Sequence, residues 1–170
     1  MHVGMNVSIR PYRPTDHGVC RSLWGELMEM REDLYEVPSS GGDPGAGFEE
    51  YLTRLDLSGM WVAEHPEDGV VGLIGLTLAG RAGEVYPVVV AQRHRSRGIG
   101  TALLAHVAEQ ARRRSLRQLA VVPDSRNVAA IRCLHSAGYD LLAAVRLTLD
   151  ITGTTRNTQD MAVHGLQFRY

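Results

Sequence analysis

The chain has 170 residues, of which 44% are hydrophobic and 22% charged, and its formal net charge is −1. This length and apolar content suffice for one domain with its own core, so we expect a single domain over residues 1–170. The near-neutral charge balance excludes proteins that bind nucleic acids or anionic membranes mainly through a strongly basic surface.

The first predicted elements are a strand and two helices. Alternation over residues 7–10 predicts a strand that ends before Pro11 and Pro14, and Thr15 or Asp16 can then cap a helix that runs to about Arg31. The Gly- and Ser-rich segment 39–47 is typical of a mobile loop, and helical spacing resumes at Phe48.

Three strands are predicted next, over residues 60–64, 70–78 and 84–91. The first two are joined by a Pro- and Gly-containing turn, which indicates an antiparallel pair. Within the third, the run Val88-Val89-Val90 lacks alternation, so we expect this strand to be buried on both faces.

The second half alternates helices with strands. Apolar periodicity predicts a helix over about 98–114, a short strand over 119–122 and a helix over 127–137. Two further strands are predicted, over 141–151 and 162–168, with a polar loop between them. This order favours a mixed α/β sheet with helices on both faces.

Features of the whole chain indicate its compartment. Cys20 and Cys133 are too few for a disulfide framework or a zinc site, which favours a reducing cytoplasm. The first residues lack the pattern of a signal peptide, and no apolar run reaches the roughly 18 to 20 residues of a membrane span. We therefore expect a cytoplasmic protein with no membrane or nucleic-acid partner and no metal.

The most informative segment follows the valine-rich strand and opens the next helix. Its residues are Arg95, Ser96, Arg97, Gly98, Ile99, Gly100 and Thr101. Glycines allow the backbone to approach an anion closely, and the free N–H groups of a first helical turn bind phosphate oxygens. The two arginines add positive charge, so the segment predicts a phosphate site, with a simple tight turn as the alternative.

Two other nucleotide motifs fit this segment poorly. A Walker loop requires a lysine after its last glycine, and none is present nearby. A dinucleotide-binding fingerprint requires a third glycine, where this chain has Leu103, and an acidic residue at the end of the next strand, where it has Val122 and Pro123. Both nucleotide classes are therefore disfavoured.

The pattern Arg95-x-x-Gly98-x-Gly100 resembles the coenzyme A loop of the GNAT superfamily of N-acetyltransferases. The resemblance continues in Asn127-x-x-Ala130 and in Gly138-Tyr139, where the family carries an Asn-x-x-Ala helix that ends in Gly-Phe. It covers most of residues 7–151, which we take as the core of the domain, with 152–170 as a loop and a last strand.

The resemblance implies the GNAT fold, a central and mostly antiparallel sheet with a splayed parallel pair and helices on both faces. It also implies acetyl-CoA as co-substrate, bound where strands 84–91 and 119–122 diverge. A bulge in the first strand would turn backbone groups toward the pantetheine. The implied cofactor-binding residues are Val88, Val89, Val90, Arg95, Ser96, Arg97, Gly98, Ile99, Gly100, Thr101 and Asn127. For Asn127, capping of the following helix is an equally good and compatible interpretation.

Acetyl transfer to an amine requires a base and a donor to the oxyanion. Glu84 begins the buried strand eleven residues before Arg95, a spacing that resembles that of the catalytic glutamate in the histone acetyltransferase branch. Partial burial would raise its pKa toward the range of a general base, whereas a solvated strand-end carboxylate is the alternative. For the oxyanion we expect the backbone N–H of Val90.

The group that protonates the leaving thiolate is less clear from the sequence. Many family members have a tyrosine four residues before the glycine of Gly-Phe, whereas this chain has Leu134. Tyr139 is expected in the core, Tyr86 on the substrate side and His135 at the surface. Water could protonate the sulfur, or the thiolate could leave unaided. The missing tyrosine motivates an alternative function, a degenerate domain that binds acetyl-CoA as a sensor or scaffold.

The acceptor is predicted to be an amine-bearing small molecule or peptide. The first two helices and the 39–47 loop would form its pocket, since variable loops beside a rigid site usually set specificity. Carboxylates between Glu26 and Glu36 would suit a cationic amine, although a solvated acidic helix face is the more ordinary explanation. A homodimer is possible by analogy with the superfamily, and the sequence does not identify the acceptor.

Overall fold

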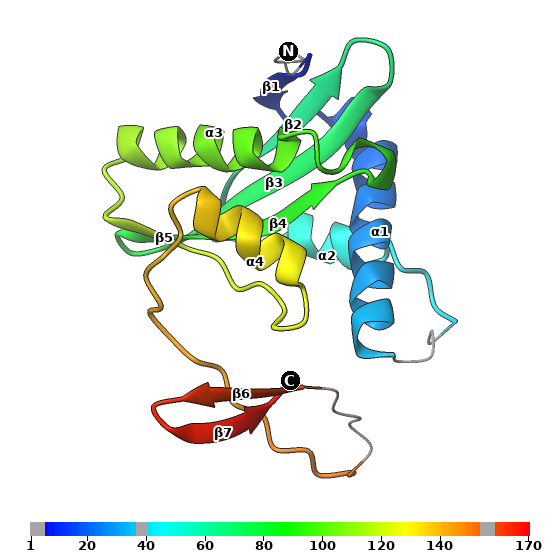
Figure 1. Ribbon diagram of the computed structural model, residues 1–170. Helices are drawn as coiled ribbons and strands as arrows, with labels where there is room; N and C mark the ends of the chain where they lie inside the picture. Colours follow the sequence, from blue (N-terminus) through cyan, green and yellow to red (C-terminus); the bar gives the residue numbers. More distant parts are fainter. Residues whose placement is uncertain (1–5, 37–40, 154–158) are drawn as a thin grey trace.

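The computed structural model describes residues 6–36, 41–153 and 159–170, which form a five-stranded sheet, a separate hairpin and helices (Figure 1). The five strands lie side by side in chain order. They are β1 (Ser8–Pro11), β2 (Leu57–His65), β3 (Gly69–Ala79), β4 (Ala82–Val90) and β5 (Gln118–Ala120). The first four pair antiparallel and β5 pairs with β4 in parallel, so the predicted mixed sheet is confirmed.

Helices cover both faces of the sheet. On one face lie α1 (His17–Tyr35) and α2 (Gly47–Leu52), and on the other lie α3 (Ile99–Arg113) and α4 (Val128–Ser136) (Figure 1). The core therefore has two halves. The first contains Cys20, Leu23, Trp24, Phe48 and Tyr51 from α1 and α2, and the second contains Ile99, Leu103, Leu104, Val107 and Leu134 from α3 and α4.

The start of α1 is fixed by charge. A 3-10 turn over Pro14–Asp16 precedes the helix, and the buried Asp16 carboxylate accepts hydrogen bonds from Arg10 at 2.8 and 3.0 Å and from the Arg13 N–H. The predicted start is thus close to the observed one. At its other end α1 continues to Tyr35, about one turn beyond the predicted end, and stops where Glu36 adopts a left-handed backbone.

The predicted 39–47 loop is only partly within the described residues, since Ser39 and Ser40 lie outside them. Its second half is attached to α1, because the Arg21 guanidinium binds the Asp43 carboxylate, which also accepts the Gly45 N–H at 2.9 Å. This anchor holds the start of α2 against α1.

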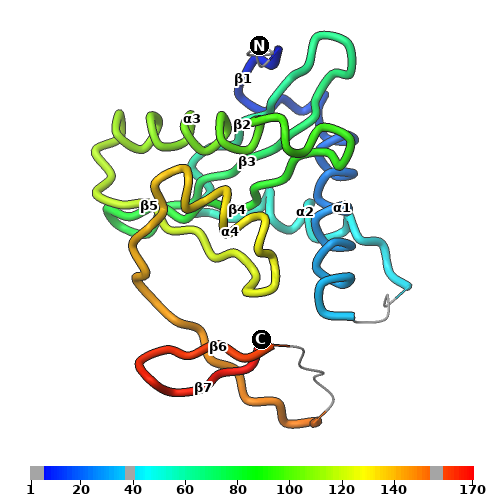
Figure 2. The backbone as a smooth tube through the Cα atoms, in the orientation of Figure 1, coloured from blue at the N-terminus to red at the C-terminus, as the bar shows by residue number. Residues whose placement is uncertain are grey.

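The end of the chain differs from the prediction. Residues 141–150, predicted to form most of a strand, are in neither helix nor strand, and Leu141, Leu147 and Leu149 are exposed. The predicted strand 162–168 is instead a hairpin of β6 (Asp160–Val163) and β7 (Leu166–Arg169), which turns at His164 and Gly165, both with positive φ. The apolar pattern identified strand-forming sequence but could not identify a pairing partner. The path of this segment away from the sheet is clear in Figure 2.

No helix within the described residues is both long and apolar enough to cross a membrane.

Candidate active site

The candidate site is the fork between β4 and β5. The two strands pair only from Ala82 to Glu84 on β4 and from Gln118 to Ala120 on β5. Beyond Glu84, β4 continues to Val90 while the chain after β5 runs toward α4 (Figure 1). Among the residues that the structure describes, the backbone of β4 beyond Glu84 therefore has no strand partner on the β5 side.

A bulge precedes the valine run of β4. Ile74 of β3 pairs with Val88 and Leu76 pairs with Val85, so Gly75 faces both Tyr86 and Pro87. A side chain at Gly75 would collide with the Tyr51 hydroxyl and the Tyr86 carbonyl, which are hydrogen-bonded to each other. The absence of a Cβ thus lets α2 reach the strand and hold the bulge in place.

The bulge determines on which side of β4 the backbone N–H and C=O groups of the following residues point. The Ala91 N–H donates to the Val71 carbonyl on β3 at 2.8 Å. Because backbone groups alternate sides along an antiparallel strand, Val89 also faces β3, whereas the N–H and C=O groups of Val88 and Val90 face the fork. Their side chains alternate as well, with Val88 and Val90 against the α3 half of the core and Val89 against the α1 half.

The glycine loop lies at the end of this strand and opens α3. Gly98 is the N-cap residue and has φ 81°, a left-handed conformation that glycine adopts without strain. The first backbone bond of the helix joins Ala102 N–H to the Gly98 carbonyl. Within the described residues, no side chain caps this end, so the amides of Ile99, Gly100 and Thr101 remain available to an anion.

The two arginines of the loop have different surroundings. The Arg95 Nε donates to the Val90 carbonyl at 3.0 Å, and its Nη2 lies 3.7 Å from the Glu26 carboxylate. Arg95 therefore ties the loop to β4 and α1. Arg97 and Ser96 are exposed, and Ser96 has φ 60°.

Two carboxylates from other elements bind the segment that precedes the glycine loop, and the sequence analysis did not connect either of them with it. Glu26 of α1 accepts the Gln92 N–H at 3.0 Å. Asp68, in the β2–β3 turn, lies 3.0 Å from Nε2 of the buried His94. These pairs are far apart in the sequence, and no local pattern could have indicated them.

α4 packs against the first turn of α3 through Cys133. The Asn127 side chain accepts a hydrogen bond from the Ala130 N–H at 3.1 Å and so caps α4, which is one of the two roles predicted for it. The Thr101 hydroxyl lies 3.8 Å from the Cys133 sulfur, which joins α3 to α4. Leu134 is buried in the core, and Tyr139 packs against the same core, where burial raises its pKa.

Glu84 lies where β4 and β5 begin to diverge. It pairs with Thr77 on β3 and Ala120 on β5, and its side chain is exposed. The partial burial expected for a general base is therefore absent. Burial is the main cause of the raised pKa of Tyr51, and the charge of Glu84, which lies nearby, raises that pKa further. Glu84 is thus on the face that carries α1 and α2.

Side chains on α1 also contact the segment between β5 and α4. Arg31 Nε lies 3.0 Å from the Asp124 carboxylate, and the Tyr35 hydroxyl donates to Asp124 at 3.4 Å. Arg126 donates to the Leu34 carbonyl at 3.2 Å, and its guanidinium stacks 4.9 Å from the Tyr35 ring centre. The sequence analysis missed this connection because its two sides are about ninety residues apart.

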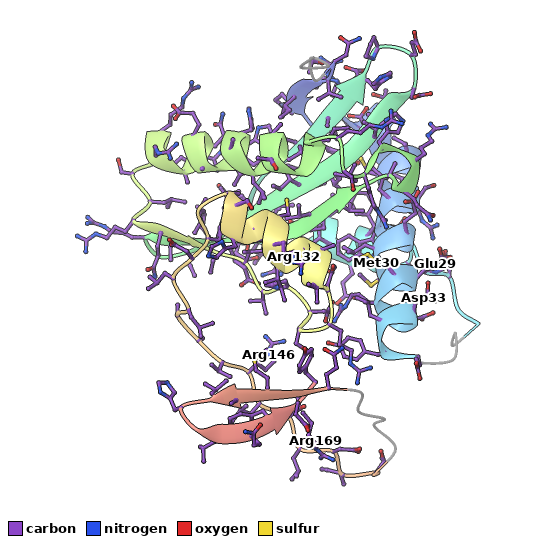
Figure 3. All side chains as sticks on the ribbon, viewed as in Figure 1. Glu29, Met30, Asp33, Arg132, Arg146 and Arg169 are labelled. Carbon is purple, nitrogen blue, oxygen red and sulfur yellow. The ribbon has the colours of Figure 1, made fainter. Side chains whose placement is uncertain are left out.

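The acidic residues of α1 do not converge on one point. Glu26 is bonded to the loop, whereas Glu29 and Asp33 are exposed (Figure 3). For these two, the solvated helix face is the interpretation that the structure favours. Cys20 is buried, which raises the pKa of its thiol to about 12 and leaves it unsuited to act as a nucleophile.

Residues 24–139 match the model of the acetyltransferase (GNAT) family. A search of curated protein sequences finds no match.

Many solved structures are similar in fold. A transcriptional regulator from Bacillus halodurans C-125 is 19% identical, with 85% of this chain and 99% of that chain covered and a TM-score of 0.63. The ribosomal-protein-S18-alanine N-acetyltransferase of Escherichia coli is 14% identical, with 78% of this chain and 76% of that chain covered and a TM-score of 0.59. An aminoglycoside acetyltransferase from an uncultured soil metagenomic sample, in complex with sisomicin, is 14% identical. The alignment covers 85% of this chain and 94% of that chain, with a TM-score of 0.60.

Proposed function

The chain belongs to the acetyltransferase (GNAT) family, and we propose that it moves an acetyl group from acetyl-CoA to a primary amine that attacks the thioester directly. The observation that carries this proposal is the fork itself. A row of amides at the start of α3 follows a strand whose backbone groups at Val88 and Val90 face the same gap. Such amides suit a diphosphate, and a strand with free groups suits the amide-containing pantetheine arm.

The direction of the bound substrate follows from the two ends of β4. With the diphosphate at residues 98–101, the pantetheine lies along Val90 and Val88, and the acetyl group points toward Glu84. The amine then enters from the face that carries α1 and α2, where Glu84, Tyr51 and Tyr86 lie.

We assign the oxyanion to the Val88 N–H in preference to the Val90 N–H expected from the sequence. A strand rises roughly 3.3 Å per residue, so Val90 is roughly 20 Å along β4 from Glu84 and Val88 roughly 13 Å. The nearer amide leaves less distance between the oxyanion and the base. The Val90 N–H is then free to bind the pantetheine, and its carbonyl holds Arg95 at 3.0 Å.

Glu84 is proposed as the base that accepts the ammonium proton. Since its carboxylate is exposed and the oxyanion amide lies roughly 13 Å away along β4, the proton passes through a chain of several waters rather than by direct contact. The neutral amine attacks the carbonyl carbon, the Val88 N–H stabilises the negative oxygen, and the C–S bond breaks to release the thiolate. With Leu134 in the core, water takes the second proton from the attacking nitrogen as the amide forms, and water protonates the thiolate.

Thiol release from acetyl-CoA tests this function. Polyamines, aminoglycosides, amino acids and peptides with free N-termini are the amines to screen, because two structural neighbours are named for an aminoglycoside and a ribosomal-protein alanine. The proposal expects at least one class to raise thiol release well above the rate without amine, with an acetylated product of matching mass. Coenzyme A binding without release on any amine would instead support the binding-only alternative.

A further inference from the structure

The glycine loop contains two residues with a left-handed backbone. Ser96 has φ 60° and Gly98 has φ 81°. Glycine adopts this conformation freely, whereas a residue with a side chain, such as serine, keeps it only where the surrounding structure fixes it. The direction of the amides of residues 99–101 depends on this path of the chain. The loop therefore requires firm contacts on the segment that leads into it.

One such contact comes from the β2–β3 turn, residues 65–69. His94 is the last residue of the 3-10 turn Gln92–His94, directly before the loop, and is 3% exposed. Its Nε2 lies 3.0 Å from Oδ2 of Asp68, and Oδ1 of the same carboxylate lies 3.7 Å from Nη2 of Arg93. One carboxylate thus contacts two successive residues of the segment that leads into the loop.

The turn itself fixes the position of this carboxylate. Nδ1 of His65 accepts the backbone N–H groups of Glu67 and Asp68, both at 3.3 Å, and Gly69 closes the turn with φ 69°. The His65 ring lies 5.2 Å from the His94 ring, measured between their centres. The backbone of the turn is therefore held by a side chain that also packs on His94, and the Asp68 carboxylate is directed toward the loop.

His94 depends on Asp68 because its ring is buried. Within the described residues, its Nδ1 has no hydrogen-bond partner, and its Nε2 is close enough to Asp68 for a charge interaction but is not aligned as a hydrogen bond. A buried polar group without a partner is costly. If the carboxylate were removed, conformations that expose His94 to solvent would gain population, and in these the loop would no longer present its amides in one direction.

We propose that Asp68 is a positioning residue for coenzyme A: through His94 it keeps the glycine loop in the conformation that binds the diphosphate, rather than by touching the ligand. This inference rests on the proposed function, which places the diphosphate at residues 98–101. When only a fraction of a protein is in the binding-competent conformation, its apparent affinity falls by that fraction. The chemistry beside Val88 and Glu84, at the other end of the cofactor, is not affected.

The first test is the affinity of the full chain for coenzyme A, measured by titration calorimetry. Asp68→Ala should weaken binding by at least about fivefold, because it leaves the buried His94 without its charged partner. Glu67→Ala is the matched control, since Glu67 is the exposed neighbour in the same turn, and it should change the affinity by less than about twofold. Equal affinities in the two variants would overturn the proposal.

The second test uses His94→Leu, which replaces the buried imidazole with an apolar side chain that requires no polar partner. Replacing both partners of a buried polar contact can be nearly neutral, so His94→Leu combined with Asp68→Ala should bind coenzyme A better than Asp68→Ala alone, within about twofold of His94→Leu. If Asp68 only stabilised its own turn, the second substitution would restore nothing, and that result would contradict a role through His94.

Acetyl transfer gives the third test and separates this inference from the proposed function. Asp68→Ala should raise the KM for acetyl-CoA with kcat at saturation within about twofold of the wild type, since saturating ligand repopulates the competent loop. A fall in kcat with KM unchanged would contradict positioning. A wild-type chain that binds no coenzyme A would overturn the proposed function as well, whereas a wild type that binds it and an Asp68→Ala variant of equal affinity would remove only the role of Asp68.

Discussion

At the scale of single residues, the backbone at Gly98 is the most constrained feature of the candidate site. Its φ of 81° turns the chain so that the following amides point out of the start of α3. A residue with a side chain would be strained in this conformation, and the direction of the Ile99, Gly100 and Thr101 amides depends on this one turn.

Gly98→Val is therefore expected to weaken coenzyme A binding by at least tenfold, with little change in the stability of the rest of the fold. Titration calorimetry measures the affinity, and Gly80→Val provides a control, since Gly80 also has positive φ but lies in the distant β3–β4 turn. Equal losses of affinity in both variants would contradict the assignment of the loop.

Glu84 tests the proposed chemistry. Glu84→Gln keeps the shape of the side chain but cannot accept a proton, so the acetylation rate should fall roughly 10²- to 10⁴-fold near neutral pH with coenzyme A affinity unchanged. Glu67→Gln, in the exposed β2–β3 turn, is the matched control. An unchanged rate in the Glu84 variant would remove this residue from the mechanism.

At the scale of elements, the glycine loop and its helix were predictable because the signal is local. The expected helix over 98–114 corresponds to Ile99–Arg113, and the expected strand over 84–91 to Ala82–Val90. The supports of the loop were not predictable, since Glu26 and Asp68 reach it from other elements. The position of the bulge depends on Gly75 and Tyr51, whose contact with Tyr86 arises only in the folded chain.

The cap of α4 gives a prediction at this scale. Asn127→Ala removes the acceptor for the Ala130 N–H, so the free energy of unfolding should fall by about 1 kcal/mol, while Asn127→Asp should retain most of it. Urea unfolding measures both. If binding of coenzyme A weakens in Asn127→Asp as well, where the cap persists, Asn127 also contacts the ligand through its amide nitrogen.

At the scale of the whole molecule, a partly buried ion pair ties the first strand to the start of the first helix. Arg10 bonds to Asp16 and holds the pKa of that carboxyl below its usual value, and Arg10 also bonds to Glu64 on β2. A lowered folded-state pKa adds stability that is complete above the unfolded value, about 3.9, and is lost as the pH falls through the folded value.

Asp16→Asn should therefore destabilise the fold by about 1 to 3 kcal/mol near neutral pH, because it leaves Arg10 with a weaker partner. The difference from the wild type should shrink as the pH falls below about 4, where the wild-type carboxyl becomes protonated. Urea unfolding at several pH values measures this, and a difference that stays constant with pH would contradict the assignment.

The arrangement of the chain's end could not be derived from one sequence. The alternation over residues 141–151 indicates a strand, but a strand also needs a pairing partner, and within the described residues this segment belongs to neither sheet. The family and the mixed sheet with its parallel pair, by contrast, were predictable, because the motifs and the periodicity that indicate them are local in the sequence. In the proposed function the acceptor amine is selected by side chains from several elements, which is why the sequence leaves it open.

A crystal structure with bound coenzyme A tests the central claim most directly. The account predicts the diphosphate on the amides of Ile99, Gly100 and Thr101, with the pantetheine along Val88 and Val90 and its thiol toward Glu84. A diphosphate bound at any other place on the molecule would contradict both the site and the roles proposed for its residues.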